Sequence, residues 1–159
     1  MCDVDRDACH NAYHNHAHQQ AHHGALLAAI GDPGGSVCDV GCGYGAFSDL
    51  LPEGVEYLGV DRNPEKIMEA SQLRPERRFL VSGRPRPADT VVFCGFAPIY
   101  VPKPHRFLAE CWKVARRTLA VSGDSSTLVE AMLRVCPGQP EVAEHEGDWP
   151  PFWTMVVRR

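Results

Sequence analysis

The sequence predicts an α/β fold in which helices cover both faces of a mostly parallel sheet. Short β-branched or aromatic runs, such as residues 90–94 (TVVFC), alternate with helical patterns and are joined to them by short loops. The last two strand-like segments have no helix between them, which predicts antiparallel pairing at one edge of the sheet. A length of 159 residues, with 44% hydrophobic and 23% charged residues, predicts a single domain over residues 1–159.

The chain begins with a histidine-rich segment, residues 1–31, that is predicted to be helical. From residue 5 to residue 30 the only helix breaker is Gly24, and Tyr13, Ala17 and Ala21 recur at helical spacing. One or two helices are expected here, with this apolar set facing the rest of the domain. The turn residues 32–35 (DPGG) end the segment and lead into a core over residues 36–159.

The elements of the core follow from the same patterns. An apolar run before a glycine-rich loop indicates a first strand, and Asn63 before Pro64 indicates a capped helix start. The predicted strands are residues 37–40, 56–60, 78–81, 90–94, 118–121, 141–144 and 152–157. The predicted helices are residues 46–51, 64–72, 104–117 and 127–135.

The loop after the first predicted strand contains three glycines, Gly41, Gly43 and Gly45. Glycine tolerates positive φ and lets a ligand approach the backbone, and ligands of such sheets bind beyond the carboxyl ends of the strands. The spacing fits two cofactors, because Gly41, Gly43 and Ala46 also match the dinucleotide fingerprint G-x-G-x-x-G/A. The glycines alone therefore leave both open.

Two acids distinguish the cofactors. Asp39 lies two residues before Gly41, where a dinucleotide would place its pyrophosphate, and like charges at that range disfavour binding. S-adenosylmethionine instead carries an ammonium group and a sulfonium. Asp61, at the end of the second predicted strand, is placed to accept hydrogen bonds from two ribose hydroxyls. The pair favours S-adenosylmethionine over NAD.

The segment VCDVGCGYG, residues 37–45, resembles motif I of the class I S-adenosylmethionine-dependent methyltransferases, and GVDRNPEKIMEA resembles their next motif. More loosely, ADTVVFCG and HRFLAECWKVARRTLAVSGD resemble the fourth strand, the helix after it and the fifth strand of the small-molecule branch that includes quinone-biosynthesis enzymes. The similarity spans roughly residues 37–124. It implies a doubly wound, Rossmann-like sheet of seven strands with the last strand antiparallel.

The resemblance also implies a cofactor-binding set. Asp39 and Gly41 would face the methionine end, Asp61 the ribose, and Arg62 with the Ser82 and Gly83 turn the adenine. The complete expected set is Asp39, Gly41, Cys42, Gly43, Gly45, Asp61, Arg62, Ser82, Gly83, Cys94 and Gly95. One departure concerns the third strand, where FLVSG lacks the acid that often receives the adenine amino group.

The methyl acceptor is expected to be a small molecule. Methylation of nucleic-acid or peptide amines typically uses an Asn/Asp-Pro-Pro-Tyr/Phe turn, and this chain has Ala97-Pro98-Ile99-Tyr100 instead. Tyr100 is a candidate for the acceptor pocket, and His105 is the best-placed general base for a phenol or carboxylic acid. No fixed catalytic residue is required, because alignment and desolvation can supply most of the catalysis.

Four histidines, His10, His14, His18 and His22, are spaced by four residues and form one stripe on a helix. Such a ladder can chelate zinc or nickel, yet it is also expected of the polar flank of a packed helix, and no metal site is predicted here. In the resembled family this helix often covers the cofactor. Tyr13 or His14 is then a candidate lid residue.

Charge and cysteine content limit the partners and the compartment. An odd count of seven cysteines, several of them in apolar segments, indicates a reducing compartment. The amino terminus has no basic start or apolar run, and no later apolar stretch approaches the length of a membrane span, so a cytoplasmic protein without a leader is expected. The net charge of -4 offers no global attraction to phosphate backbones. Nucleic-acid binding is disfavoured, since the arginine cluster at residues 74–86 is typical of a solvated turn region. The cleft is expected to be open, or closed by the histidine-rich helix or by a second subunit in a homodimer. The competing function is a non-catalytic S-adenosylmethionine-binding or metal-responsive partner module.

Overall fold

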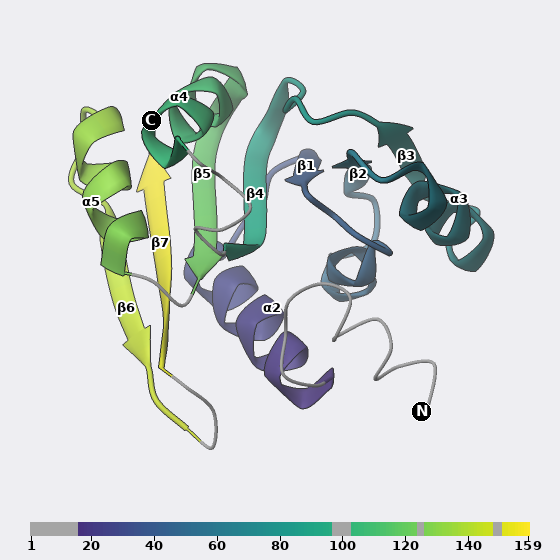
Figure 1. The fold of residues 1–159 in the computed structure, drawn as a ribbon, viewed down its shortest axis with the longest axis horizontal. Coiled ribbons are helices and arrows are strands. Elements are labelled where there is room, and N and C mark those ends of the chain that lie inside the picture. Colours follow the sequence, from purple (N-terminus) through teal and green to yellow (C-terminus); the bar gives the residue numbers. More distant parts are fainter. Residues whose placement is uncertain (1–15, 97–102, 124–125, 148–150) are drawn as a thin grey trace.

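The computed structural model describes residues 16–96, 103–123, 126–147 and 151–159 (Figure 1). Within these ranges the strands form one seven-stranded sheet in the order β3-β2-β1-β4-β5-β7-β6. The strands are β1 Ser36–Val40, β2 Glu56–Asp61, β3 Arg78–Val81, β4 Ala88–Phe96, β5 Ala115–Gly123, β6 Glu141–His145 and β7 Phe152–Arg158. All seven predicted strands are confirmed.

The sheet is parallel except at β7. Neighbouring strands from β3 to β5 pair in parallel, whereas β7 pairs antiparallel with both β5 and β6. β7 thus lies between β5 and β6 and runs against all the other strands. The predicted doubly wound sheet with its last strand antiparallel is confirmed.

Helices cover both faces of the sheet, as expected. They are α2 His16–Ile30, the 3-10 helix η1 Ala46–Leu50, α3 Pro64–Leu73, α4 Pro104–Val114 and α5 Ser126–Val135. One buried cluster joins α4 and α5 to the sheet through residues such as Leu108 and Met132. The other joins α2 and η1 to the opposite face through Leu26 and Phe47.

The start of α3 forms as the sequence predicts. The Oδ1 of Asn63 accepts hydrogen bonds from the backbone N–H groups of Glu65, at 2.9 Å, and Lys66, at 3.3 Å, and Pro64 occupies the first turn. This cap satisfies donors that the helix itself leaves unpaired. It also fixes the chain directly after Asp61.

The predicted helices over residues 46–51 and 104–117 differ in the structure. The segment after the glycine loop is a five-residue 3-10 helix rather than an α-helix, since Pro52 leaves little room for longer turns. Ala115, predicted to lie on the helix over residues 104–117, instead begins β5, because α4 ends at Val114 and passes into the strand without a loop.

The buried face of α2 is not the predicted one. Ala17 is exposed and Ala21 is half-buried, whereas His18 and His22 are fully buried. Tyr13 of the predicted apolar face, and His10 and His14 of the stripe, lie outside the described residues. The prediction that the histidines form a polar flank is therefore wrong for His18 and His22. Both face the sheet, where His22 contacts Ser122 and His18.

Candidate active site

The candidate site lies where β1, β2 and β4 end. These three strands are adjacent and parallel, so their carboxyl ends share one edge of the sheet. Asp39 of β1 is in register with Gly59 of β2 and Val92 of β4. The acids and glycines separated in the sequence are thus brought together beside this edge.

The glycine loop bends over the end of β2. The backbone N–H groups of Gly41 and Cys42 both donate to the carbonyl of Val60, at 2.7 and 3.1 Å. The N–H of Gly43 donates to Oδ2 of Asp61 at 3.0 Å. Gly41, Gly43 and Gly45 have φ values of 72°, 56° and 82°, which L side chains rarely adopt. The loop requires glycine at these positions.

Asp39 is a buried carboxylate with a single neutral partner. It is 2% exposed, and its Oδ2 accepts a hydrogen bond from the Tyr57 hydroxyl at 2.8 Å. Within the described ranges no ion pair involves it. Burial raises the pKa of Asp39 to about 7, the Tyr57 hydrogen bond opposes this rise, and the charge of Asp61 adds to it. The carboxylate therefore sits where a cation would stabilise it.

Asp61 organises the neighbouring loops. Besides the bond from Gly43, its Oδ1 accepts the N–H of Asn63 at 2.9 Å, and its backbone carbonyl accepts the N–H of Ser82 at 2.8 Å. Each carboxylate oxygen has a second lone pair beyond the one used here. Asp61 thus holds three segments together and keeps acceptor capacity.

Arg62, Ser82 and Gly83 lie side by side beyond β2 and β3. A Cβ added at Gly83 would stand 2.6 Å from Nε of Arg62, so the Arg62 side chain lies against the Gly83 backbone. Ser82 closes a local turn, because its Oγ accepts the N–H of Arg84 at 3.1 Å. The resemblance implies that Arg62 and the Ser82–Gly83 turn face the adenine together, and in the structure these residues are neighbours.

The end of β4 contributes Cys94 and Gly95. The N–H of Gly95 donates to Oγ of Ser122 on β5 at 3.3 Å, and Gly95 has a φ of 73°. Burial raises the pKa of the Cys94 thiol well above its ordinary range, and the charge of Asp39 adds to this rise. Cys42 is also buried, and burial raises its thiol pKa well above the ordinary value. Both thiols are therefore protonated at neutral pH and are poor nucleophiles.

The two candidate catalytic residues stand apart from this cluster. His105 is exposed in the first turn of α4. Tyr100 lies outside the described residues, as does the rest of its turn. No group of three metal-ligating side chains occurs in the part of the chain that the structure describes. There is also no helix among the described residues with the length and apolar character needed to cross a membrane.

Two residues of the arginine cluster, Arg74 and Arg77, hydrogen-bond other parts of the fold. Arg74 donates through Nε to Asp49 at 2.7 Å and through Nη1 to the carbonyl of Tyr44 at 2.9 Å. Arg77 donates to the carbonyls of Val55 and Ser48, each at 3.1 Å. These two guanidinium groups fix the segment around η1.

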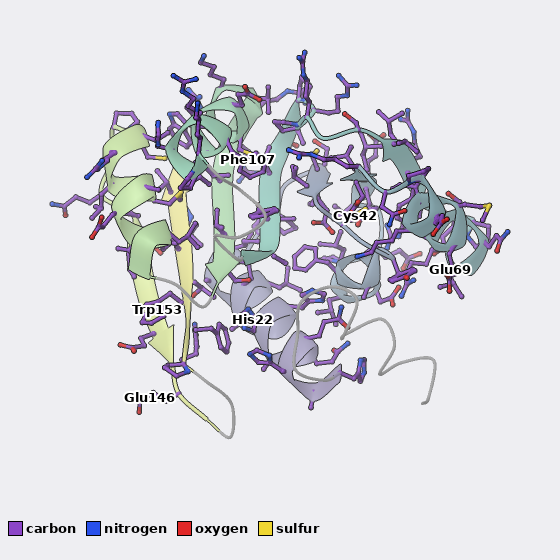
Figure 2. All side chains as sticks on the ribbon, viewed as in Figure 1. His22, Cys42, Glu69, Phe107, Glu146 and Trp153 are labelled. Carbon is purple, nitrogen blue, oxygen red and sulfur yellow. The ribbon has the colours of Figure 1, made fainter. Side chains whose placement is uncertain are left out.

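Sequence reasoning missed two residues of this region, Tyr57 and Ser122, and gave a third, His22, a different place on a polar flank. Tyr57 hydrogen-bonds Asp39, and His22 of α2, labelled in Figure 2, lies 3.3 Å from Oγ of Ser122 at the end of β5. The signal for His22 was present, since α2 contains four histidines yet no Lys, Arg, Asp or Glu. Tyr57 and Ser122 carry no comparable signal, because their partners are distant in the sequence.

The comparisons with known proteins agree with this geometry. Residues 13–122, more than half of the chain, match a family model described as a methyltransferase domain. The search of curated proteins found no match to this sequence.

Solved structures share the fold at low sequence identity. Magnesium protoporphyrin IX methyltransferase (ChlM) from Synechocystis PCC 6803 with bound SAM superposes with a TM-score of 0.71 at 18% identity, covering 100% of this chain and 85% of that one. N-methyltransferase NodS from Bradyrhizobium japonicum WM9, in complex with S-adenosyl-l-homocysteine, gives 0.69 at 14% identity, covering 87% and 86%. Precorrin-6y C5,15-methyltransferase from Geobacter metallireducens GS-15 gives 0.67 at 12% identity, covering 86% and 88%.

The family match, the strand order and the acid-flanked glycine loop concur. The chain belongs to the class I S-adenosylmethionine-dependent methyltransferase family.

Proposed function

We propose that this protein transfers the methyl group of S-adenosylmethionine to a small-molecule acceptor. The family match supports methyl transfer. Solved structures of the same fold are named for porphyrin, geranyl diphosphate and precorrin methyltransferases, which supports a small-molecule acceptor. The observation that carries the proposal is the buried Asp39 carboxylate beside the glycine loop.

Asp39 fits this cofactor because it is buried without a cationic partner among the described residues. A buried carboxylate is costly unless a positive group or several hydrogen bonds compensate it, and here only Tyr57 donates to it. A ligand with an ammonium group offers that compensation. A pyrophosphate would increase the repulsion that Asp61 already exerts.

The residues proposed to hold the cofactor divide by its parts. Asp39 with Gly41 and Cys42 would take the methionine end, and Asp61 the ribose through the lone pairs that Gly43 and Asn63 leave free. The remaining members, proposed for the adenine side and the methyl side, are Gly45, Arg62, Ser82, Gly83, Cys94 and Gly95. When bound, the cofactor supplies an electrophilic methyl group on a sulfonium. The chain's own contribution is alignment of the acceptor and exclusion of water.

Calorimetric titration with S-adenosylhomocysteine tests the proposal. Asp39→Asn and Asp61→Asn should each weaken binding at least tenfold, since each removes a charge-assisted contact worth roughly 1.5–3 kcal/mol. Asp32→Asn is the matched control, because Asp32 precedes β1 at the other end of the sheet and its side chain is 75% exposed. The control should bind like the parent.

Three results would contradict parts of the proposed function. Equal affinity of the parent and Asp39→Asn would show that the buried acid does not hold the ligand. Tighter binding of NAD than of S-adenosylhomocysteine would contradict the choice of cofactor. Tight binding with no methyl transfer to hydroxyl, amine, thiol or carbon acceptors would support a non-catalytic binding module.

We further propose that residues 1–159 form one methyltransferase domain of a cytoplasmic enzyme. The described cysteines Cys38, Cys42, Cys94, Cys111 and Cys136 are all free, which supports a reducing setting. The inward polar face of α2 supports closure of the acceptor side by this helix rather than by a second subunit. His105 and Tyr100 remain proposals for the acceptor side.

A further inference from the structure

The two halves of α2 bury different kinds of side chain. His18, Gln19 and His22 are at most 1% exposed, in the half nearer the carboxyl ends of β4 and β5. Leu26 and Ile30, in the other half, join the apolar core. The helix, HAHQQAHHGALLAAI, contains no Lys, Arg, Asp or Glu. Burying polar groups costs free energy unless they gain partners, so the polar half needs an explanation.

His22 ties this polar half to the strand ends. Its Nδ1 lies 3.3 Å from Oγ of Ser122, and its Nε2 lies 3.0 Å from Nε2 of His18. Its ring stacks on Phe152 of β7 with the centroids 3.7 Å apart. Because Ser122 also accepts the N–H of Gly95, the amino-terminal half of α2 is linked to the end of β4. Figure 2 shows His22 on α2 below these strands.

Gln19 is buried but incompletely satisfied. Among the described residues its Oε1 has no hydrogen-bond partner, and neither does the buried Nδ1 of His16, one turn earlier. Gln19 lies one turn before His23, whose ring packs edge-on against Phe47 of η1 with centroids 5.5 Å apart. Buried polar atoms are nearly always bonded, so two unpartnered atoms on adjacent turns indicate a polar ligand.

His23, one turn after Gln19 on the helix, is held in its uncharged form. The pKa of His23 is lowered to about 3, mainly by burial and also by the neighbouring His22, whereas Asp49 opposes the shift. His23 is therefore an uncharged imidazole at neutral pH. Since α2 itself has no Lys or Arg, it offers no ammonium or guanidinium group to a carboxylate or a phosphate. It offers amide and imidazole groups to an uncharged ligand.

We propose that this face of α2 recognises an uncharged methyl acceptor that carries hydroxyl groups, with Oε1 of Gln19 accepting a hydrogen bond from one hydroxyl. The inference rests on the proposed function, which requires an acceptor near the ends of β4 and β5. His22 is a positioning residue, because both of its ring nitrogens are already engaged.

Ligand binding tests the inference in the full-length protein saturated with S-adenosylhomocysteine. Catechol and benzoate serve as a hydroxyl probe and a charged probe of similar size. Catechol should bind at least tenfold more tightly than benzoate. Gln19→Met, which keeps the side-chain length, should weaken catechol binding about tenfold through loss of one buried hydrogen bond. Gln20→Met is the control, because Gln20 is only half-buried and lies beside this face.

Thermal unfolding of the ligand-free variants separates recognition from structure. Gln19→Met removes an unpartnered oxygen, so its melting temperature should equal or exceed that of the parent. A lower melting temperature would assign the oxygen a structural role and overturn the inference. Unchanged catechol affinity in Gln19→Met would overturn it as well.

The order of the titrations distinguishes the two proposals. If S-adenosylhomocysteine fails to bind, the proposed function and this inference fall together. If it binds and catechol does not, or benzoate binds more tightly than catechol, the hydroxyl acceptor alone is refuted.

Discussion

Asp39 makes the stability of the ligand-free protein depend on pH in an unusual direction for an acid. Most paired carboxylates have a lowered pKa and stabilise the fold as pH rises. Burial instead raises the pKa of Asp39 to about 7 from its ordinary 3.8. The folded state therefore binds a proton that the unfolded state releases, between about pH 4 and pH 7.

The protonated Asp39 consequently makes its full contribution to the free energy of unfolding below about pH 4. This contribution decreases as pH rises to about 7. Over this window Asp39→Asn should gain stability relative to the parent by on the order of a few kcal/mol, since one pKa unit is worth about 1.4 kcal/mol. Urea unfolding of both proteins at several pH values between 4 and 8 measures the difference. Parallel curves would contradict the raised pKa.

At the scale of single elements, a glycine inside α2 and the glycine directly after it should respond oppositely to alanine. Gly24 is inside the helix, and a Cβ there would meet nothing within 4 Å. Gly31 follows the helix with a φ of 70°, and its N–H donates to the carbonyl of Leu27 at 3.0 Å. The first position favours alanine and the second favours glycine.

Gly24→Ala should therefore raise the free energy of unfolding by about 1 kcal/mol. Gly31→Ala should lower it by about 1 kcal/mol, because alanine is strained at positive φ although space is available. Chemical denaturation of the two variants gives both values. A loss of stability in Gly24→Ala would mean that α2 does not pack as described.

The same helix shows where sequence reasoning succeeds and where it fails. The sequence predicts a helix ending before residues 32–35, and α2 ends at Ile30. It does not predict which face is buried, because histidine was treated as a surface residue. Ser122 and Phe152, which give His22 its partners, lie about 100 residues or more away in the chain. Local periodicity contains no information about such partners.

The cofactor loop was predictable for the opposite reason. Asp39, Gly41 and Gly43 are close in sequence, and the chemistry of the proposed ligand favours these residue types. The structure adds what they touch: Val60 receives the loop's N–H groups, and Tyr57 donates to Asp39. Those contacts depend on the pairing of β1 with β2, which a linear pattern does not specify in detail.

At the scale of the whole molecule, Arg158 joins three elements. From β7 it forms an ion pair with Glu141 of β6, and its Nη2 donates to the carbonyls of Ala29, at 2.8 Å, and Ile30, at 3.3 Å, at the end of α2. A cation suits the last carbonyls of a helix. Arg158 thus links the end of α2 to the antiparallel edge of the sheet.

Arg158→Met should lower the free energy of unfolding by about 1 kcal/mol, a value reduced by the partial exposure of the guanidinium. Arg134→Met, on the exposed side of α5, serves as the control and should change stability by less than about 0.5 kcal/mol. Thermal or urea unfolding measures both. Equal losses in the two variants would assign Arg158 no special role.

The position of β7 between β5 and β6 also governs the order of assembly. β6 precedes β7 in the chain, yet its contact with the sheet passes through β7. On the ribosome, where the chain emerges from its amino terminus, β6 must wait unpaired until β7 has been synthesised. The parallel part of the sheet, with the glycine loop and both acids, can form before then. If the cofactor binds during synthesis, it would consequently stabilise a partly assembled sheet that already contains the glycine loop, Asp39 and Asp61.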